Sequence, residues 1–148
     1  MILLDANILV YSINERAPQN TPAVHLIVAA QERRFPAVLV PQTILEFIAT
    51  VTNPRRVSDP LSFAAVRETI DLLLDKVPVL PVESSALSRL ADLLDSYPRT
   101  GSRIYDLFLV AQMQTHGISQ ICTYNVRDFS GLPGIEALTP DHVLAALS

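Results

Sequence analysis

Two acidic residues near the start of the chain stand where carboxylates can do chemistry. Asp5 directly follows the apolar run Ile2–Leu4, which is typical of a short buried strand. Ligands of parallel α/β sheets bind beyond such strand ends, although capping of the next helix is an equally good interpretation of Asp5 alone. Glu46 has small or uncharged neighbours at three- and four-residue spacing, which leaves room for an ion or a substrate. For Glu46 alone, a solvated side chain is the simpler interpretation.

Two further acidic residues follow in the last third of the chain. Asp106 shares a predicted helical face with apolar side chains, where a buried charge needs a compensating partner. The purely structural alternative is an ion pair with Arg103, three residues earlier on the same helix. Asn125 and Asp128 come just after the apolar segment 118–123, so they belong to the same edge of the predicted sheet. Turn formation is the alternative role for this pair.

Several carboxylates at one sheet edge cannot all stay ionised at close range without a cation among them. Mg²⁺ or Mn²⁺ binds one or two carboxylates and keeps positions for water and phosphate oxygens. Such a site suits phosphodiester hydrolysis, in which one ion activates the attacking water and the same or a second ion stabilises the developing charge. The catalytic residues expected on this basis are Asp5, Glu46, Asp106 and Asp128.

The pattern of short apolar runs alternating with helices predicts the scaffold for these residues. It indicates one domain over residues 1–148, an α/β three-layer sandwich with a mostly parallel central sheet flanked by helices. Extended segments are expected at residues 2–4, 37–40, 77–82, 118–123 and 134–138. Helices are expected after Asp5, at 21–34, 41–52, 59–76, 84–96 and 102–117, and from 139 onward.

Composition narrows the class of protein. The 148 residues are 49% apolar, and 11 Lys and Arg stand against 15 Asp and Glu, for a net charge of −4. This excludes a disordered chain, and no apolar run approaches the ~18 residues of a membrane span, nor is a signal peptide visible. The single cysteine, Cys122, lies in an apolar run typical of a buried strand and fits a reducing cytoplasm. Acidic charge argues against broad adhesion to nucleic acid but leaves room for local basic contacts.

The ordered set of motifs resembles the PIN domain, and within it most closely the VapC toxins of bacterial toxin–antitoxin pairs. The residues that carry the resemblance are Leu3 to Tyr11, Glu46, Asp106 with Ala111, and Thr123-x-Asn125-x-x-Asp128-Phe129. They occur in family order from Ile2 to about Pro140, so the resemblance covers nearly the whole chain.

The resemblance implies a Mg²⁺- or Mn²⁺-dependent cytoplasmic endoribonuclease that acts on RNA, is often a homodimer and is held inactive by a cognate VapB-like antitoxin. It implies metal ligands at Asp5, Glu46 and Asp106, and ligand-orienting polar residues at Asn7, Thr123 and Asn125. The chain departs from the stricter pattern at the fourth acidic position. Asn125 stands where many relatives have an acid, and Asp128 follows three residues later. Either residue could supply the fourth ligand, with one metal ion or two.

Arginines near the acidic motifs are the candidates for contact with RNA. All cationic residues except Lys76 are arginine, whose planar fork suits phosphate. The candidates are Arg16, Arg99, Arg103 and Arg127. For any one of them, a solvated surface charge is the simpler interpretation.

Two other functions compete with the nuclease. A phosphatase of the haloacid-dehalogenase type also begins with a strand ending in an aspartate, but it needs an acid two residues later, where Asn7 stands. A catalytically silent binding module has no need for four retained acids. A PIN nuclease that works in RNA processing outside a toxin–antitoxin pair is the closest variant of the main hypothesis.

Overall fold

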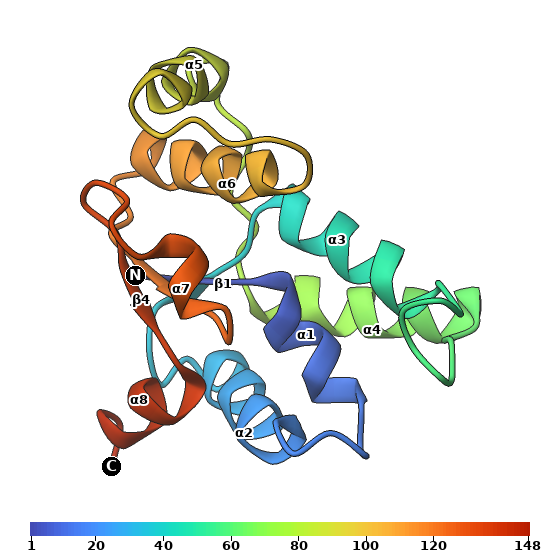
Figure 1. Cartoon of the computed structure of the whole chain (residues 1–148). Coiled ribbons are helices and arrows are strands. Elements are labelled where there is room, and N and C mark those ends of the chain that lie inside the picture. The colour runs from blue at the N-terminus through green and yellow to red at the C-terminus, as the bar shows by residue number, and fades with distance from the viewer.

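The computed structural model describes residues 1–148 and has a four-stranded, fully parallel sheet at its centre (Figure 1). The strands are β1 (Ile2–Leu4), β2 (Ala37–Val38), β3 (Gln120–Cys122) and β4 (Glu136–Leu138), in the spatial order β2-β1-β3-β4. In the register of β1, Leu3 pairs with Val38 on one side and with Ile121 on the other. The first strand of the chain is therefore an inner strand, and residues after it lie at the middle of the sheet edge.

Eight helices surround this sheet. They are α1 (Ala6–Ile13), α2 (Asn20–Gln31), α3 (Pro41–Val51), α4 (Phe63–Lys76), α5 (Ala86–Ser96), α6 (Arg103–Thr115), α7 (Val126–Phe129) and α8 (Pro140–Ala145). In Figure 1, α5 and α6 lie on one side of the strands, and α1, α2, α4 and α8 on the other.

Two apolar cores separate the layers. Successive side chains of a strand point to opposite faces, so Leu4 packs in one core with α1, α2 and α4, whereas Leu3 packs in the other with α5, α6 and α7. Both leucines are fully buried. Two cores, one on each face of a parallel sheet, confirm the predicted three-layer α/β sandwich.

Three helices begin at residues other than those predicted. The helix expected from residue 84 begins at Ala86. The helix expected from residue 59 begins at Phe63, because the Ser62 hydroxyl accepts a hydrogen bond from the Ala65 N–H and caps it. The helix expected from residue 21 begins at Asn20 without a side-chain cap. The amide of Asn20 instead donates to the carbonyls at the end of α1 and ties the two helices together.

The segment predicted as extended at 77–82 makes only a single bridge to the sheet. The bridge joins Leu39 to Val79, with Leu39 N–H donating to Pro78 O and Leu80 N–H donating to Leu39 O. Pro78 and Pro81 have no N–H with which to continue a ladder, so the expected edge strand does not extend further.

The predicted burial of Cys122 in a strand is confirmed. Cys122 is fully buried in β3, and burial raises the pKa of its thiol to about 12, so the thiol is unreactive. Thr139 caps α8 by accepting from the His142 N–H, and Gly117 adopts a left-handed φ of 66° after α6. No helix combines the length and apolar character needed to cross a membrane.

Candidate active site

Both carboxylate oxygens of Asp5 are held by hydrogen bonds at the end of β1. It is the N-cap of α1, with Oδ1 accepting from the Ala6 N–H at 2.7 Å. The other oxygen, Oδ2, accepts from Thr123 Oγ1 at 2.6 Å and from Asn7 Nδ2 at 3.0 Å. A carboxylate has about four acceptor positions, so three hydrogen bonds fix Asp5 and leave one position for a ligand.

Thr123 and Asn7 form a closed network behind Asp5. Thr123 is fully buried, and its hydroxyl accepts from Asn7 Nδ2 and from the Asn125 N–H, both at 3.0 Å, while donating to Asp5. Asn7 Oδ1 accepts from the Tyr124 N–H at 3.2 Å. The network joins the ends of β1 and β3 and sets the direction of the Asp5 carboxylate. Asn125 takes part through its backbone N–H, and its exposed side chain makes no hydrogen bond.

Glu46 reaches the same region from α3. The buried face of α3 is Thr43, Phe47 and Val51, and Glu46 lies half-buried beside it. Leu45, expected on the apolar face, is 65% exposed instead. Gln42 Nε2, one turn before Glu46, donates to its Oε1 at 2.7 Å, so the carboxylate is held rather than freely solvated.

The pKa shifts of Asp5 and Asp106 indicate that the four acidic side chains lie near one another. Burial, opposed by the Thr123 hydrogen bond, raises the pKa of Asp5 to about 6, with Glu46 and Asp128 adding to the rise. Burial also raises the pKa of Asp106 to about 6, helped by repulsion from Asp128, Asp5 and Glu46. Asp106 lies in the first turn of α6, and Asp128 lies on α7. Four separate elements thus present like charges to one another, and we refer to these residues as the acidic cluster.

Arg99 is the cation that faces this cluster. It lowers the pKa of Asp106, and its Nη1 donates to the Asp128 carbonyl at 3.2 Å. The predicted alternative for Asp106, an ion pair with Arg103, is wrong. The two ion pairs of the chain are Arg67–Asp71 and Lys76–Asp75, both on α4. Arg103 is exposed on the first turn of α6 and leaves Asp106 without a direct partner.

The residues of the acidic cluster fit a hard divalent ion by their chemistry. All the donors are carboxylate oxygens, and their mutual repulsion is what a divalent cation would relieve. No three His, Cys, Asp or Glu side chains are close enough to form a complete metal cage by themselves. Mg²⁺ usually binds one or two carboxylates and completes its shell with waters and phosphate oxygens, so it would not need three of these side chains at once.

Comparison with known proteins identifies the family of this chain. The model of the PIN domain matches residues 2–134. The chain belongs to the PIN domain family. No curated protein matches it by sequence.

Several solved structures have the same fold and are distant in sequence. VapBC-1 from nontypeable Haemophilus influenzae is 20% identical, with a TM-score of 0.65 over 95% of this chain and 99% of that one. VapBC2 from Rickettsia felis, bound to a DNA fragment from its promoter, is 17% identical, with a TM-score of 0.66 over 94% and 98%. Mycobacterium tuberculosis VapC20, described as a sarcin-ricin loop cleaving toxin, is 16% identical, with a TM-score of 0.62 over 82% and 87%.

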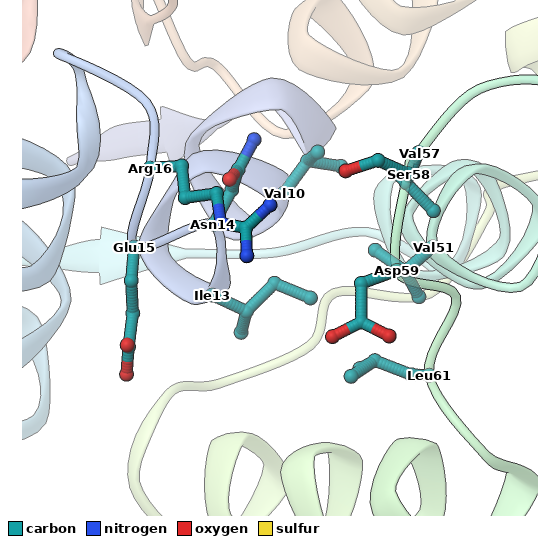
Figure 2. A pocket seen from close by; sticks show the side chains of 10 residues that line it. All are labelled: Val10, Ile13, Asn14, Glu15, Arg16, Val51, Val57, Ser58, Asp59 and Leu61. Atoms are coloured by element: carbon teal, nitrogen blue, oxygen red, sulfur yellow. The ribbon is translucent and has the colours of Figure 1, made fainter.

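The remaining arginine candidates lie at different distances from the acidic cluster of this PIN domain. Arg127 is exposed on α7, next to Asp128 in sequence. Arg16 follows α1, whose eight residues span about 12 Å, so it lies at the opposite end of that helix from Asp5. Figure 2 shows Arg16 at a separate pocket of about 380 Å³, also lined by Asp59.

Two polar residues of the site were missed from sequence: Gln42 and Gln112. Gln42 could have been found, because its four-residue spacing from Glu46 on one helix is the distance of a side-chain hydrogen bond. Gln112 is a lone polar residue in the apolar run 107–113, and it is fully buried. Arg99 was predicted as a contact for RNA, but its contact with α7 was not, because that contact depends on how the segment before α6 folds against α7.

The network behind Asp5 makes a first prediction. In metal-free protein, Thr123→Val keeps the shape but removes a hydroxyl that bonds a buried carboxylate. We expect it to lower the free energy of unfolding by about 1.5 to 3 kcal/mol, measured with urea in EDTA. Thr69→Val is the matched control, because the Thr69 hydroxyl bonds only the Ala65 carbonyl on α4. Equal losses in both variants would contradict the role given to Thr123.

Proposed function

We propose that this PIN domain is a metal-dependent endoribonuclease and the toxin of a VapBC-type toxin–antitoxin pair. One observation carries the proposal. Asp5, Glu46, Asp106 and Asp128 come from four separate elements at the carboxyl edge of a parallel sheet, where Glu46 and Asp128 raise the pKa of Asp5 and the other three acids raise that of Asp106. Carboxylates that repel one another destabilise the metal-free protein. Such a cluster is expected at a functional site that binds a cation together with an anionic substrate.

In the proposed reaction the chain's own residues bind and orient. Asp5, fixed by Thr123 and Asn7, would hold the ion together with Asp106 and Glu46, and Asp128 would complete the set. When bound, the ion supplies activation of water and stabilisation of charge on the phosphate. Arg99, beside Asp106 and Asp128, is placed to contact a phosphate at the same site.

The proposed partners rest on the relatives rather than on contacts of this chain. Several structural neighbours are complexes of a VapC-type protein with its antitoxin, some of them bound to DNA, and one is described as a toxin that cleaves an RNA loop. We therefore propose RNA as the substrate, a VapB-like antitoxin as the inhibitor, a homodimer as the assembly and the cytoplasm as the place of action.

The direct test uses purified protein free of any partner. It is incubated with a structured RNA in Mg²⁺ or Mn²⁺, and then with excess chelator. We expect cleavage that stops in chelator and returns when the ion is restored in excess. If a short antitoxin gene lies next to this one, its co-expression should yield a complex that does not cleave. RNA that stays intact under all ionic conditions would contradict the nuclease.

The phosphatase alternative makes a different prediction in the same experiment. It needs a phosphorylated Asp5 and an acid at position 7 to protonate the leaving group. Asn7 cannot supply that proton, and its amide is occupied by Asp5, Thr123 and Tyr124. Hydrolysis of small phosphomonoesters through an acid-stable aspartyl-phosphate would favour the phosphatase. Cleavage of RNA without any neighbouring antitoxin gene would favour a PIN nuclease of RNA processing.

A further inference from the structure

A chain of side-chain hydrogen bonds leads from the interior of α6 to Glu46. Gln112 Nε2 donates to Gln42 Oε1 at 2.7 Å, and Gln42 Nε2 donates to Glu46 Oε1 at 2.7 Å. Gln42 Nε2 also donates to the carbonyl of Tyr105 at 2.9 Å, directly before Asp106. Gln42 thus joins one acid of the cluster to the helix turn that carries another.

Which group donates and which accepts in each of these hydrogen bonds is fixed by the acceptors at the Glu46 end. A carboxylate and a carbonyl only accept, so the Gln42 NH₂ group must face Glu46 and Tyr105. The Gln42 oxygen must then face Gln112, whose NH₂ group donates to it and, at 3.4 Å, to the Phe108 carbonyl. Both protons of each amide are used, and neither amide can flip without losing these bonds.

The burial of Gln112 is costly to the fold. The residue is fully buried, and its Oε1 has no hydrogen-bond partner. A buried acceptor without a partner lowers stability, whereas an apolar side chain of the same shape would not. Packing alone therefore gives no reason for an amide here. What the Gln112 amide does provide is an NH₂ group that donates a hydrogen bond to Gln42 and fixes its side chain.

We propose that Gln42 and Gln112 are positioning residues that hold the Glu46 carboxylate towards the acidic cluster. Gln42 acts by direct contact with Glu46, and Gln112 acts only through Gln42. The inference rests on the proposed function, because Glu46 is taken as one of the residues that bind the ion. Partners behind a metal ligand orient it and raise its affinity for the ion.

The test measures Mn²⁺ affinity by titration calorimetry on chelator-stripped protein, together with the urea midpoint. We expect Gln42→Met to raise the Kd for Mn²⁺ by about 10- to 100-fold, the range for loss of a partner behind a ligand. Gln112→Met, one bond further away, should raise it by roughly 3- to 10-fold while the urea midpoint is unchanged or higher. Gln114→Met is the matched control on α6, since Gln114 makes no side-chain hydrogen bond to α3.

A double variant separates positioning from packing. If Gln112 acts only through Gln42, then adding Gln112→Met to Gln42→Met should raise the Kd no further. Additive effects, or a Kd in Gln112→Met equal to that of Gln114→Met, would overturn the inference while the proposed function stands. A parallel loss of affinity and stability in Gln112→Met would overturn it as well. Wild-type protein that binds no Mn²⁺ would overturn the proposed function and this inference with it. If Gln112→Met does not fold, the test uses Gln42→Met, whose position is half-buried. Its Kd for Mn²⁺ is then compared with that of Gln114→Met.

Discussion

Asp106→Asn is expected to reduce RNA cleavage by on the order of 10²- to 10³-fold, the loss typical of removing one preorganised charge-stabilising group. Asparagine has nearly the same shape but no charge, so it keeps the packing of the first turn of α6. Asp106 accepts no hydrogen bond from another residue, and its charge is therefore its main contribution to the site. Cleavage is measured at saturating Mn²⁺ on the RNA that the wild-type protein cleaves.

The control for this variant is Asp95→Asn, which removes an exposed carboxylate from α5. It should cleave like the wild type. Asp5→Asn should be at least as defective as Asp106→Asn, because it also disturbs the bonds to Asn7 and Thr123. Cleavage within about threefold of wild type in Asp106→Asn would remove this residue from the proposed site.

Asp106→Asn is expected to be more stable than wild type without metal and less stable than wild type when Mn²⁺ is added. In EDTA near pH 7.5, Asp106→Asn should unfold at higher urea than wild type, because it removes a carboxylate that is partly buried and is also repelled by three others. A pKa rise from 3.8 to about 6 would correspond to about 3 kcal/mol for a fully buried group. Asp106 is half-buried, so solvent screening leaves roughly 1 kcal/mol. Mn²⁺ at about 100 times its Kd should add about 2.7 kcal/mol to wild type and far less to the variant.

The stability difference between Asp106→Asn and wild type should depend on pH in a direction set by the raised pKa of Asp106. A carboxyl whose pKa is higher in the folded than in the unfolded chain destabilises the fold once the pH exceeds both values. The stability gap between Asp106→Asn and wild type in EDTA should therefore be full above about pH 7 and should shrink as the pH falls through 6 towards 4. A gap that widens on acidification would contradict repulsion within the acidic cluster.

The sequence predicted the parts of the fold that depend on local pattern. The strand 2–4, the helix that begins at Pro41 and the cap at Thr139 are set by apolar runs and capping residues within a few positions. Asp5 also shows why the two interpretations could not be separated from sequence, since Oδ1 caps α1 while Oδ2 bonds Thr123 and Asn7 at the site proposed for the ion. The start of α4 was missed because Asp59 and Ser62 are both good caps, and only packing selects between them.

Contacts between distant segments were beyond local pattern. Arg103 has the spacing of a helical partner for Asp106, yet Arg99, from the segment before the helix, is the cation that acts on it. The bond between Gln112 and Gln42 joins residues 70 positions apart. Such pairs depend on the angle at which α3 and α6 meet the sheet edge, and residue spacing along one helix carries no information about that angle.

The place of β1 in the sheet also determines when the acidic cluster can exist during synthesis. β1 is made first but pairs with β3, and Asp5 bonds Thr123 across 118 positions. At roughly 5 to 20 residues per second, a ribosome reaches Thr123 about 6 to 24 seconds after Asp5. Until then Asp5 lacks its hydroxyl partner and Asp128 has not been added. A chain of this topology cannot assemble its acidic cluster until the ribosome has passed Asp128.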